Sequence, residues 1–433
     1  MHAGSDQFDP RDAEDVARRI RACVSTKQAG FEDVLCPLIA SACVAVVPKN
    51  ARNFNVDNVR VCKMVGAGMY DSEVVRGLVL PRPAEGTIRA AEKVKVVVYA
   101  QGVEAGTTET KGTVLIKSAE ELLNYSKSEE EAMEKVVRGI ADAGVGLVVS
   151  GGAISELAMH FLEKFRIMVI RSNSKFDIRR ICRATGEQPG PSRKPQAASR
   201  ARVEFQPQPL PTLPPPLPLA GAVSLLKFAP PTQDELGFAR EVSVQEIGGT
   251  TCTVLRQDEA MGQVATVILR GATQQILDDA ERAVDDGVNA YRVLTRDART
   301  LPAGGATEMT AASALLKEAR QASGLDQYAI QKFAESLEVV PRVLAENSGH
   351  NATDAVTRLH AAHAEGQQGA GLDLVTGEVR DLSPDGIVDL YMTKWWAIKL
   401  ASDAVNTVLK VDQIIMAKQA GGPKPRGPGQ DDD

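Results

Sequence analysis

The sequence predicts a multidomain protein that is part α/β and part mostly α-helical. Its 433 residues suggest about three domains at roughly 150 residues each. Strands and helices alternate through the middle of the chain, which is typical of a parallel α/β unit. Helical material flanks that unit on both sides, which indicates a domain inserted into an outer one.

The segment before the α/β unit is predicted to be helical. Apolar residues recur at helical spacing in two stretches of residues 11–46, which predicts two helices. Residues 53–61, with the sequence NFNVDNVRV, look extended.

The α/β unit is expected from about Gly66 onward. Its strands are β-branched runs, and Gly144 follows its longest helix as a C-terminal stop. The expected elements are a strand at 93–100, a helix at 118–144, a strand at 146–152, a helix at 154–165, a strand at 167–171 and a helix at 175–186.

The last part of the chain is predicted to contain strands and then helices. VSVQEIGGTTCTVL and residues 262–271 are expected strands, and residues 274–290 an amphipathic helix that ends at Gly287. The remainder to Lys418 is expected to be mostly helical, in segments at 309–322, 326–349, 353–366 and 385–418.

A proline-rich segment interrupts the α/β unit. Ten of the 23 prolines lie between Glu187 and Gly221. Repeated proline removes backbone donors and favours polyproline II, so residues 187–221 are expected to be a disordered insert. Two explanations stay open: PLPTLPPPLP offers PxxP spacings to SH3-type or WW-type domains, or the tract is non-native coding sequence such as a retained intron.

Composition argues against several functional classes. Lys and Arg number 50 and Asp and Glu 56, a net charge of −6, which argues against nucleic-acid binding through overall charge. No apolar run approaches the roughly 20 residues that span a bilayer, and the polar, acidic N-terminus is not a signal or transit peptide. The cytoplasm is the expected location, without membrane association.

No metal site is expected. The six cysteines form no CxxC pair, which favours free thiols in a reducing compartment. His360 and His363 lie three residues apart on a predicted helix, but a solvated helix face is favoured over a metal pair because no third ligand is evident.

Several long segments resemble one protein family. They are NFNVDNVRV (53–61), TETKGTVLI (108–116), VLTRDARTLPAGGATEM (293–309), FAESLEVVPRVLAENSG (333–349) and VDQIIMAK (411–418). In this order they resemble the cytosolic group II chaperonins, the subunits of the T-complex chaperonin. The resemblance implies equatorial, intermediate and apical domains, and assembly with seven other subunits into two stacked rings. It also implies the use of ATP and Mg²⁺ to fold unfolded clients such as actin and tubulin.

The resemblance implies domain boundaries as well. Residues 1–65 resemble the first intermediate segment with some equatorial contact, 66–265 the apical client-binding domain, and 266–303 the returning intermediate segment. Residues 304–418 resemble the C-terminal half of the helical equatorial domain, and 419–433 are expected to be a disordered tail. The N-terminal half of the equatorial domain is expected to be missing from this chain.

The resemblance assigns the catalytic role to one carboxylate. Asp286, in ERAVDDGVN, matches the aspartate that positions the attacking water, and Asp285 takes the neighbouring non-catalytic place. Lys27, in VSTKQ, matches a lysine that senses the γ-phosphate as a point charge, with Thr26 as a hydroxyl contact. From the residues alone, Asp286 belongs to a solvated helix end and Lys27 is a surface charge.

The rest of the ATP site is implied to lie in the C-terminal half. Gly304 and Gly305, in PAGGATE, match a turn where the backbone approaches the ribose, although an alanine replaces the first of three family glycines. Asp389 matches an acceptor for ribose hydroxyls, and Lys394 a lysine near the same edge. Gly371 matches a position where the family backbone passes close to the nucleotide base.

Two phosphate-binding motifs of the family are not found. They are a Gly-Pro-x-Gly turn and a Gly-Asp-Gly-Thr motif that supplies a magnesium-binding aspartate. Gly248-Gly249-Thr250-Thr251 resembles the second only superficially and is interpreted as a turn between strands. This chain is therefore expected to bind and hydrolyse ATP poorly or not at all, and ATPase activity is implied by the resemblance alone.

Client binding is implied to lie in the apical unit. The helix from Lys175 to Ala184 resembles a client-facing groove, and residues 108–134 a helical lid protrusion. The candidates, which mix apolar and basic groups suited to acidic clients, are Phe176, Ile178, Arg179, Arg180 and Arg183. Periodicity alone favours Ile178 and Ile181 in the domain core. An alternative function stays open: a non-catalytic apical fragment that holds clients without an ATP cycle.

Overall fold

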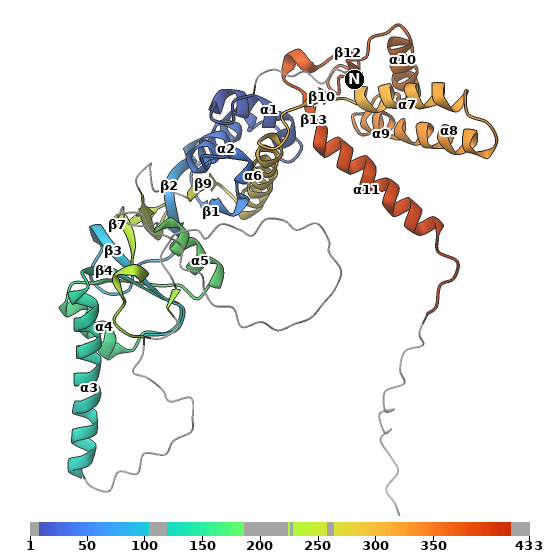
Figure 1. Cartoon of the computed structure of the whole chain (residues 1–433). Coiled ribbons are helices and arrows are strands. Elements are labelled where there is room, and N and C mark those ends of the chain that lie inside the picture. The colour runs from blue at the N-terminus through green and yellow to red at the C-terminus, as the bar shows by residue number, and fades with distance from the viewer. Residues whose placement is uncertain (1–7, 104–118, 186–223, 226–227, 258–263, 417–433) are drawn as a thin grey trace, which may run out of the picture.

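The computed structural model describes residues 8–103, 119–185, 224–225, 228–257 and 264–416. The predicted insert, the predicted tail and the segment 108–116 lie outside the described residues. Three units follow one another across the molecule in Figure 1. We call them the middle unit (residues 8–65 and 265–294), the α/β unit (residues 73–257) and the helical unit (residues 300–416).

The middle unit is built on three helices beside two parallel strands. These are α1 (Ala13–Ser25), α2 (Glu32–Val46) and α6 (Gln274–Leu294), with β1 (Val59–Val65) paired to β9 (Ala265–Gly271). The Asp12 side chain accepts from the backbone N–H of Glu14 at 3.0 Å, which caps the start of α1. Val16, Ile20 and Val24 recur every four residues and are buried in a core shared with α2 and α6. The two helices predicted in residues 11–46 are confirmed.

Two details of the middle unit differ from the expectation. The stretch 53–61 is extended only at its end, because short 3₁₀ turns at Ala51–Asn53 and Val56–Asn58 precede β1. The prediction that the sixth helix ends at Gly287 is wrong, since α6 continues to Leu294. A Cβ at Gly287 would lie 2.9 Å from Ile39 Cδ1, so this glycine permits close helix packing instead of ending a helix.

One strand, β2 (Glu73–Leu80), crosses from the middle unit into the α/β unit. Residues 73–76 pair with β9, and residues 77–80 pair with β8 (Thr250–Arg256). Gly77 stands at the crossing with a φ of 133°, and a Cβ there would overlap the carbonyl oxygen of Leu255. The two units therefore share one continuous sheet, in the order β1-β9-β2-β8-β7-β3-β4-β5.

The α/β unit shows the predicted alternation in a mixed sheet. Strands β3 (Ala90–Tyr99), β4 (Val145–Ser150) and β5 (Met168–Arg171) are parallel, whereas β7 (Gly237–Ile247) and β8 are antiparallel. Helix α5 (Lys175–Ala184) covers one face, and α3 (Ala119–Asp142) and α4 (Glu156–Lys164) cover the other. Gly144 follows α3 with a φ of 79°, as its predicted stop. The short elements are η3 (Met69–Asp71), β6 (Ser224–Leu225) and η4 (Gln233–Glu235).

The helical unit contains five helices within the described residues and two small two-stranded sheets. Its helices are α7 (Ala306–Ala319), α8 (Leu325–Leu337), α9 (Val339–Asn347), α10 (Ala352–Ala364) and α11 (Tyr391–Leu409). The strands pair as β10 (Thr300–Pro302) with β13 (Val388–Leu390), and β11 (Ala370–Leu372) with β12 (Val379–Asp381). The turn η5 (Ser383–Asp385) precedes β13.

Two predicted helices of this unit need correction. The segment 326–349 is divided at Glu338 into α8 and α9 because Pro341 belongs in a first helical turn, where its missing N–H needs no partner. The segment 385–418 begins with β13, since Gly386 adopts a left-handed φ of 76°, and its helix ends at Leu409.

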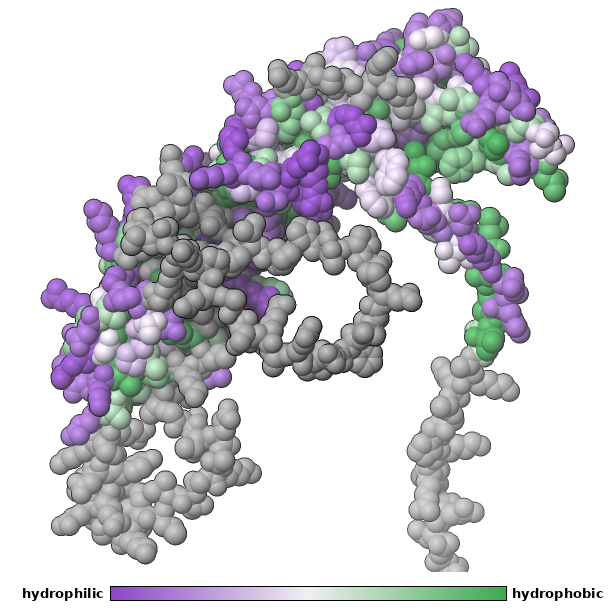
Figure 2. All heavy atoms as spheres, viewed as in Figure 1, coloured by the Kyte–Doolittle hydropathy of each residue, from purple (hydrophilic) through white to green (hydrophobic). Residues whose placement is uncertain are grey.

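A wide apolar groove lies between α8 and α11. It encloses about 930 Å³. No residue of α11 is buried, and Figure 1 shows this helix standing away from the other helices. Apolar side chains gather on this unit and along α11 in Figure 2. The exposed apolar residues that line the groove include Phe333, Val340, Val405 and Leu409. Within the described residues, no helix is both long and apolar enough to cross a membrane.

Candidate functional site

Lys27 and Asp286 face each other across the middle unit. Lys27 follows the last turn of α1 and Asp286 lies on α6, with 4.0 Å between Lys27 Nζ and Asp286 Oδ2. Both side chains are about half exposed, so the pair is open to a ligand. The Thr26 hydroxyl donates to the carbonyl of Cys23 at 2.7 Å, which commits its proton to its own helix end.

Asp389 belongs to the same cleft. It lies on β13, which α1 and α6 both contact. Burial raises the pKa of the Cys23 thiol to about 11, and the charges of Asp286 and Asp389 add to that effect. The contacts of β13 with α1 and α6 bring together the elements that carry the predicted ribose acceptor Asp389 and the predicted water-positioning acid Asp286, at the junction of the middle and helical units.

Lys394 holds two carboxylates together beside that junction. Its Nζ lies 3.0 Å from Asp389 Oδ2 and also donates to Glu308 Oε1. Burial lowers the pKa of Lys394, but Asp389 and Glu308 together raise it above the ordinary value. The sequence patterns did not identify Glu308 as a candidate. The signal that could have identified it is a carboxylate in the first helical turn after Gly304 and Gly305.

The predicted glycine turn is present and needs its glycines. Gly304 and Gly305 have φ values of 66° and 84°, which side-chain-bearing residues rarely adopt. The N–H of Leu372 donates to the carbonyl of Gly304 at 2.8 Å. A Cβ at Gly371 would overlap the carbonyl oxygen of Ala303. The turn and β11 therefore pack backbone to backbone, and Gly371 serves this contact.

Among the described residues, no group of three or more His, Cys, Asp or Glu side chains is arranged to hold a metal ion. Gly248 and Gly249, with φ values of 62° and 75°, form the turn between β7 and β8. That interpretation of the GGTT segment is confirmed.

The predicted client helix is divided between core and surface. Ile178 and Ile181 are buried against the sheet, so the prediction of Ile178 as a surface contact is wrong and the core interpretation is confirmed. Phe176 is 66% exposed, and Arg179 is exposed beside it. Arg180 pairs with Asp177 at 3.1 Å in its own helix.

Arg183 contacts the middle unit. Its guanidinium lies 3.7 Å from Asp57, which follows from the position of α5 near the crossing of β2. Arg183 therefore links the α/β unit to the middle unit.

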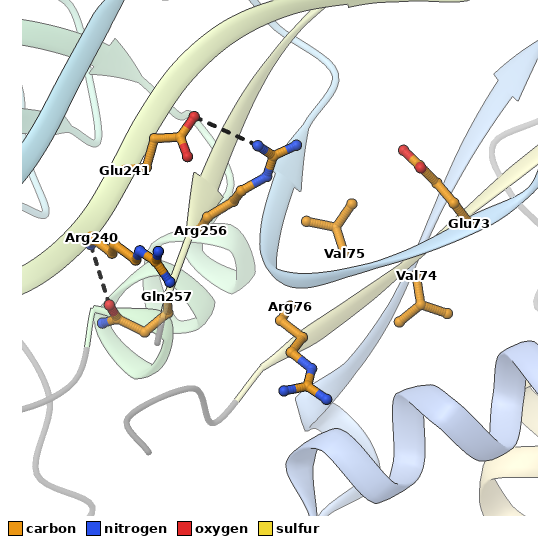
Figure 3. A pocket seen from close by; sticks show the side chains of 8 residues that line it. All are labelled: Glu73, Val74, Val75, Arg76, Arg240, Glu241, Arg256 and Gln257. Atoms are coloured by element: carbon orange, nitrogen blue, oxygen red, sulfur yellow. Dashed lines mark hydrogen bonds and ion pairs between the residues drawn. The ribbon is translucent and has the colours of Figure 1, made fainter. Parts of the chain in front are cut away.

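A second cavity of about 370 Å³ lies where β2 crosses between the units (Figure 3). Its charged lining is partly self-paired, since Arg256 lies 3.6 Å from Glu241. The Gln257 amide donates to the carbonyls of Ala184 and Phe238 and accepts from the N–H of Arg240. None of the predicted site residues lines this cavity, which is a junction between units.

Comparison with known proteins gives a consistent result. A family described as the TCP-1/cpn60 chaperonin family matches residues 3–201 and 217–419, so the unmatched residues 202–216 lie inside the proline-rich segment. T-complex protein 1 subunit theta from Arabidopsis thaliana is 46% identical over 424 residues, which are 98% of this chain and 71% of that relative. The Mus musculus protein of the same name is 43% identical over 417 residues, with 96% and 70% covered.

A solved structure shares the fold. The open-state monomer of a group II chaperonin from Methanococcoides burtonii superimposes with a TM-score of 0.64 at 24% identity, covering 93% of this chain and 87% of that one. At this identity the similarity shows the fold alone. The family match and the theta-subunit relatives together show that the chain belongs to the TCP-1/cpn60 chaperonin family.

Proposed function

We propose that this chain is a subunit of an ATP-dependent cytoplasmic chaperonin that encloses and folds unfolded proteins. The observation that carries the proposal is that Lys27 and Asp286 face each other on α1 and α6, both of which contact the strand of Asp389 where the middle and helical units join. The relatives named as theta subunits support a hetero-oligomer, in which seven other subunits complete each of two stacked rings.

The three units support a domain assignment. We propose that residues 1–65 and 266–303 form the intermediate domain, 66–265 the apical domain and 304–418 half of the equatorial domain. The shared sheet supports the first division because β2 leaves β9 at Gly77 and continues in the α/β unit. The open groove beside α11 supports the last, since a helix with no buried residue lacks the packing that stabilises helices in proteins.

The geometry of the cleft suits the hydrolysis of a bound nucleotide. Asp286 offers a carboxylate that orients water, and Lys27 is a cation 4.0 Å away that attracts a terminal phosphate. The glycine turn and Asp389 are suited to a ribose edge, because the turn follows β10, whose Leu301 pairs with Asp389 on β13. ATP and Mg²⁺ are the family's cofactors, but we assign no step to the metal in this chain.

We infer that this chain binds ATP only weakly. The cleft offers a sensor, a water-orienting acid and a ribose edge, whereas neither family phosphate-binding motif occurs in the printed sequence. Calorimetric titration with MgATP is expected to give weak or undetectable heat. Tight binding by the purified chain would contradict this inference.

The apical face is proposed to hold clients, with actin and tubulin as the family's examples. Exposed Phe176 beside exposed Arg179 supplies an apolar anchor and a positive charge for a partly folded acidic chain. The same observation favours the second candidate function, a non-catalytic fragment that holds clients. The SH3-ligand and retained-intron explanations of residues 187–221 stay proposals, since that segment lies outside the described residues.

Two measurements test the subunit and client proposals. A tagged chain expressed with the seven other subunits is expected to co-purify in a double-ring particle; a chain isolated only as a monomer would favour the client-holding fragment. Suppression of aggregation of denatured actin is expected without ATP, and Phe176→Ser is expected to weaken it. Lys93→Ser, at a position outside α5, is the matched control and is expected to have no effect.

A further inference from the structure

We propose that Glu308 is a positioning residue of the nucleotide cleft. It draws the Lys394 ammonium toward the protein interior, so that Asp389 keeps its capacity to accept from a ligand hydroxyl. The inference rests on the proposed function, because it takes Asp389 as the acceptor for the nucleotide ribose.

Glu308 occupies a position that favours a buried carboxylate. It is in the first turn of α7, directly after the Gly304–Gly305 turn, where the positive end of the helix dipole stabilises negative charge. The residue is only 4% exposed. A carboxylate taken out of water requires a partner, since burial of an unpaired charge is costly.

That partner is Lys394. The Lys394 ammonium donates to Glu308 Oε1, while the other oxygen, Oε2, is buried and has no hydrogen-bond partner among the described residues. The only ion pair of Glu308 in the part of the chain that the structure describes is therefore with Lys394. The lysine is thus the main source of stabilisation for the buried charge.

Asp389 competes for the same ammonium from a wetter position. Its Oδ2 lies 3.0 Å from Lys394 Nζ, and its side chain is 35% exposed, against 5% for Glu308. Attraction between charges is stronger where water is excluded. Glu308 therefore holds the ammonium more firmly, and the more accessible Asp389 remains only partly neutralised.

The charges explain why both carboxylates are needed. One ammonium between two carboxylates leaves one net negative charge on the cluster of Glu308, Lys394 and Asp389. Without the charge of Glu308, Lys394 would pair with Asp389 alone and compete with a ribose hydroxyl for its oxygens. Glu308 thus sets the accepting strength of Asp389 without touching the ligand.

Chemical reactivity of Lys394 tests the cluster without any nucleotide. An amine reacts with acetylating reagents only when deprotonated, and Asp389 and Glu308 raise the pKa of Lys394. In Glu308→Gln we expect Lys394 to be acetylated about tenfold faster at fixed pH, which corresponds to a fall of one pKa unit. Peptide mass spectrometry reads the rate, with the exposed Lys410 as an internal reference.

A control variant distinguishes this positioning role from a general loss of structure around Lys394. Glu318→Gln changes an exposed carboxylate on the same helix α7 and is expected to leave Lys394 reactivity unchanged. Circular dichroism confirms that each variant is folded. Unchanged Lys394 reactivity in folded Glu308→Gln, or equal acceleration at Lys394 and Lys410, would overturn the proposal.

A second arm separates this inference from the proposed function. Saturation-transfer NMR at high ADP concentration detects weak binding through the ribose protons, and Glu308→Gln is expected to reduce that signal severalfold. No transfer to wild-type chain would contradict the nucleotide site, and with it the positioning role, even if Lys394 reactivity changes as expected. Equal transfer in wild type and Glu308→Gln would overturn the positioning role alone.

Discussion

At the scale of single residues, the cleft is defined by charges that act on one another at a distance. Asp286 and Asp389 come from elements a hundred residues apart in the chain, yet both influence the thiol of Cys23. Lys27 acts on the same thiol with the opposite sign. Cys23 is therefore a natural reporter of the electrostatics of the predicted site.

Thiol alkylation measures that field. Only the thiolate reacts, and burial with two nearby carboxylates raises the pKa of Cys23 to about 11. Asp286→Asn is expected to lower this pKa and speed alkylation of Cys23 severalfold at pH 8. Lys27→Met is expected to have the opposite effect, since it removes a cation that favours the thiolate.

Cys182 provides the control for this experiment. Burial raises its pKa to about 11 as well, but neither Asp286 nor Lys27 contributes to that increase. Its alkylation rate is expected to be the same in all variants. A change of equal size at Cys23 and Cys182, or no change at Cys23, would show that the cleft charges are not arranged as described.

At the scale of elements, Gly287 shows how packing overrides a local sequence signal. A glycine near the end of an amphipathic pattern predicts a helix stop, yet α6 runs through it because Ile39 and Val24 leave no room for a Cβ. Gly287→Val is expected to destabilise the protein by about 2 kcal/mol through overpacking. Asn289→Val, on the exposed side of the same helix, introduces the same side chain without the clash and with little change in helix propensity, and is expected to cost about 0.5 kcal/mol or less.

Urea unfolding monitored by circular dichroism compares the two valine variants. A clearly lower midpoint is expected for Gly287→Val than for Asn289→Val. Similar midpoints would mean that α1, α2 and α6 are packed less closely than described.

Gly77 determines how β2 passes between two units. Its φ of 133° and the adjacent Leu255 carbonyl leave no conformation for a side chain. Gly77→Ala is expected to cost about 3 kcal/mol and to expose the crossing to limited proteolysis. Gly249→Ala also has a positive φ but meets nothing within 4 Å, so it is expected to cost about 1 kcal/mol.

The proteolysis pattern decides whether Gly77 has this role. Faster cleavage near residues 73–80 in Gly77→Ala, but not in Gly249→Ala, is the expected result. Identical digestion of both variants would contradict the assignment of Gly77 to a sterically required crossing.

The limits of sequence interpretation follow from the same physics. Periodicity predicted α1 and α2 because it reflects which face of a helix is buried, and β-branched runs predicted the buried strands of the α/β unit. Periodicity also placed Ile178 in the core, although family resemblance made this residue a surface candidate. Glu308 was missed because its importance depends on Lys394, 86 positions away, and no local pattern records such a pair.

At the scale of the whole molecule, the helical unit presents an unusually open apolar face. Val405 and Leu409 line the groove beside α8 and are mostly exposed. Changing both to lysine is expected to reduce binding of the dye ANS severalfold, while the free energy of unfolding changes by about 0.5 kcal/mol or less. Thr357→Lys on α10 is the control, since it adds a lysine outside the groove and is expected to leave ANS binding unchanged. A large loss of stability would show that this face is already packed in solution.

The location of the nucleotide cleft is the central claim, and hydrogen exchange tests it most directly. The full chain is compared with and without saturating ADP, so that weak binding is no obstacle. We predict slower exchange in peptides that cover the glycine turn at 300–309 and β13 with the start of α11 at 388–394. Protection confined to the junction cavity lined by residues 73–76, 240–241 and 256–257, with none at the glycine turn or β13, would contradict the account.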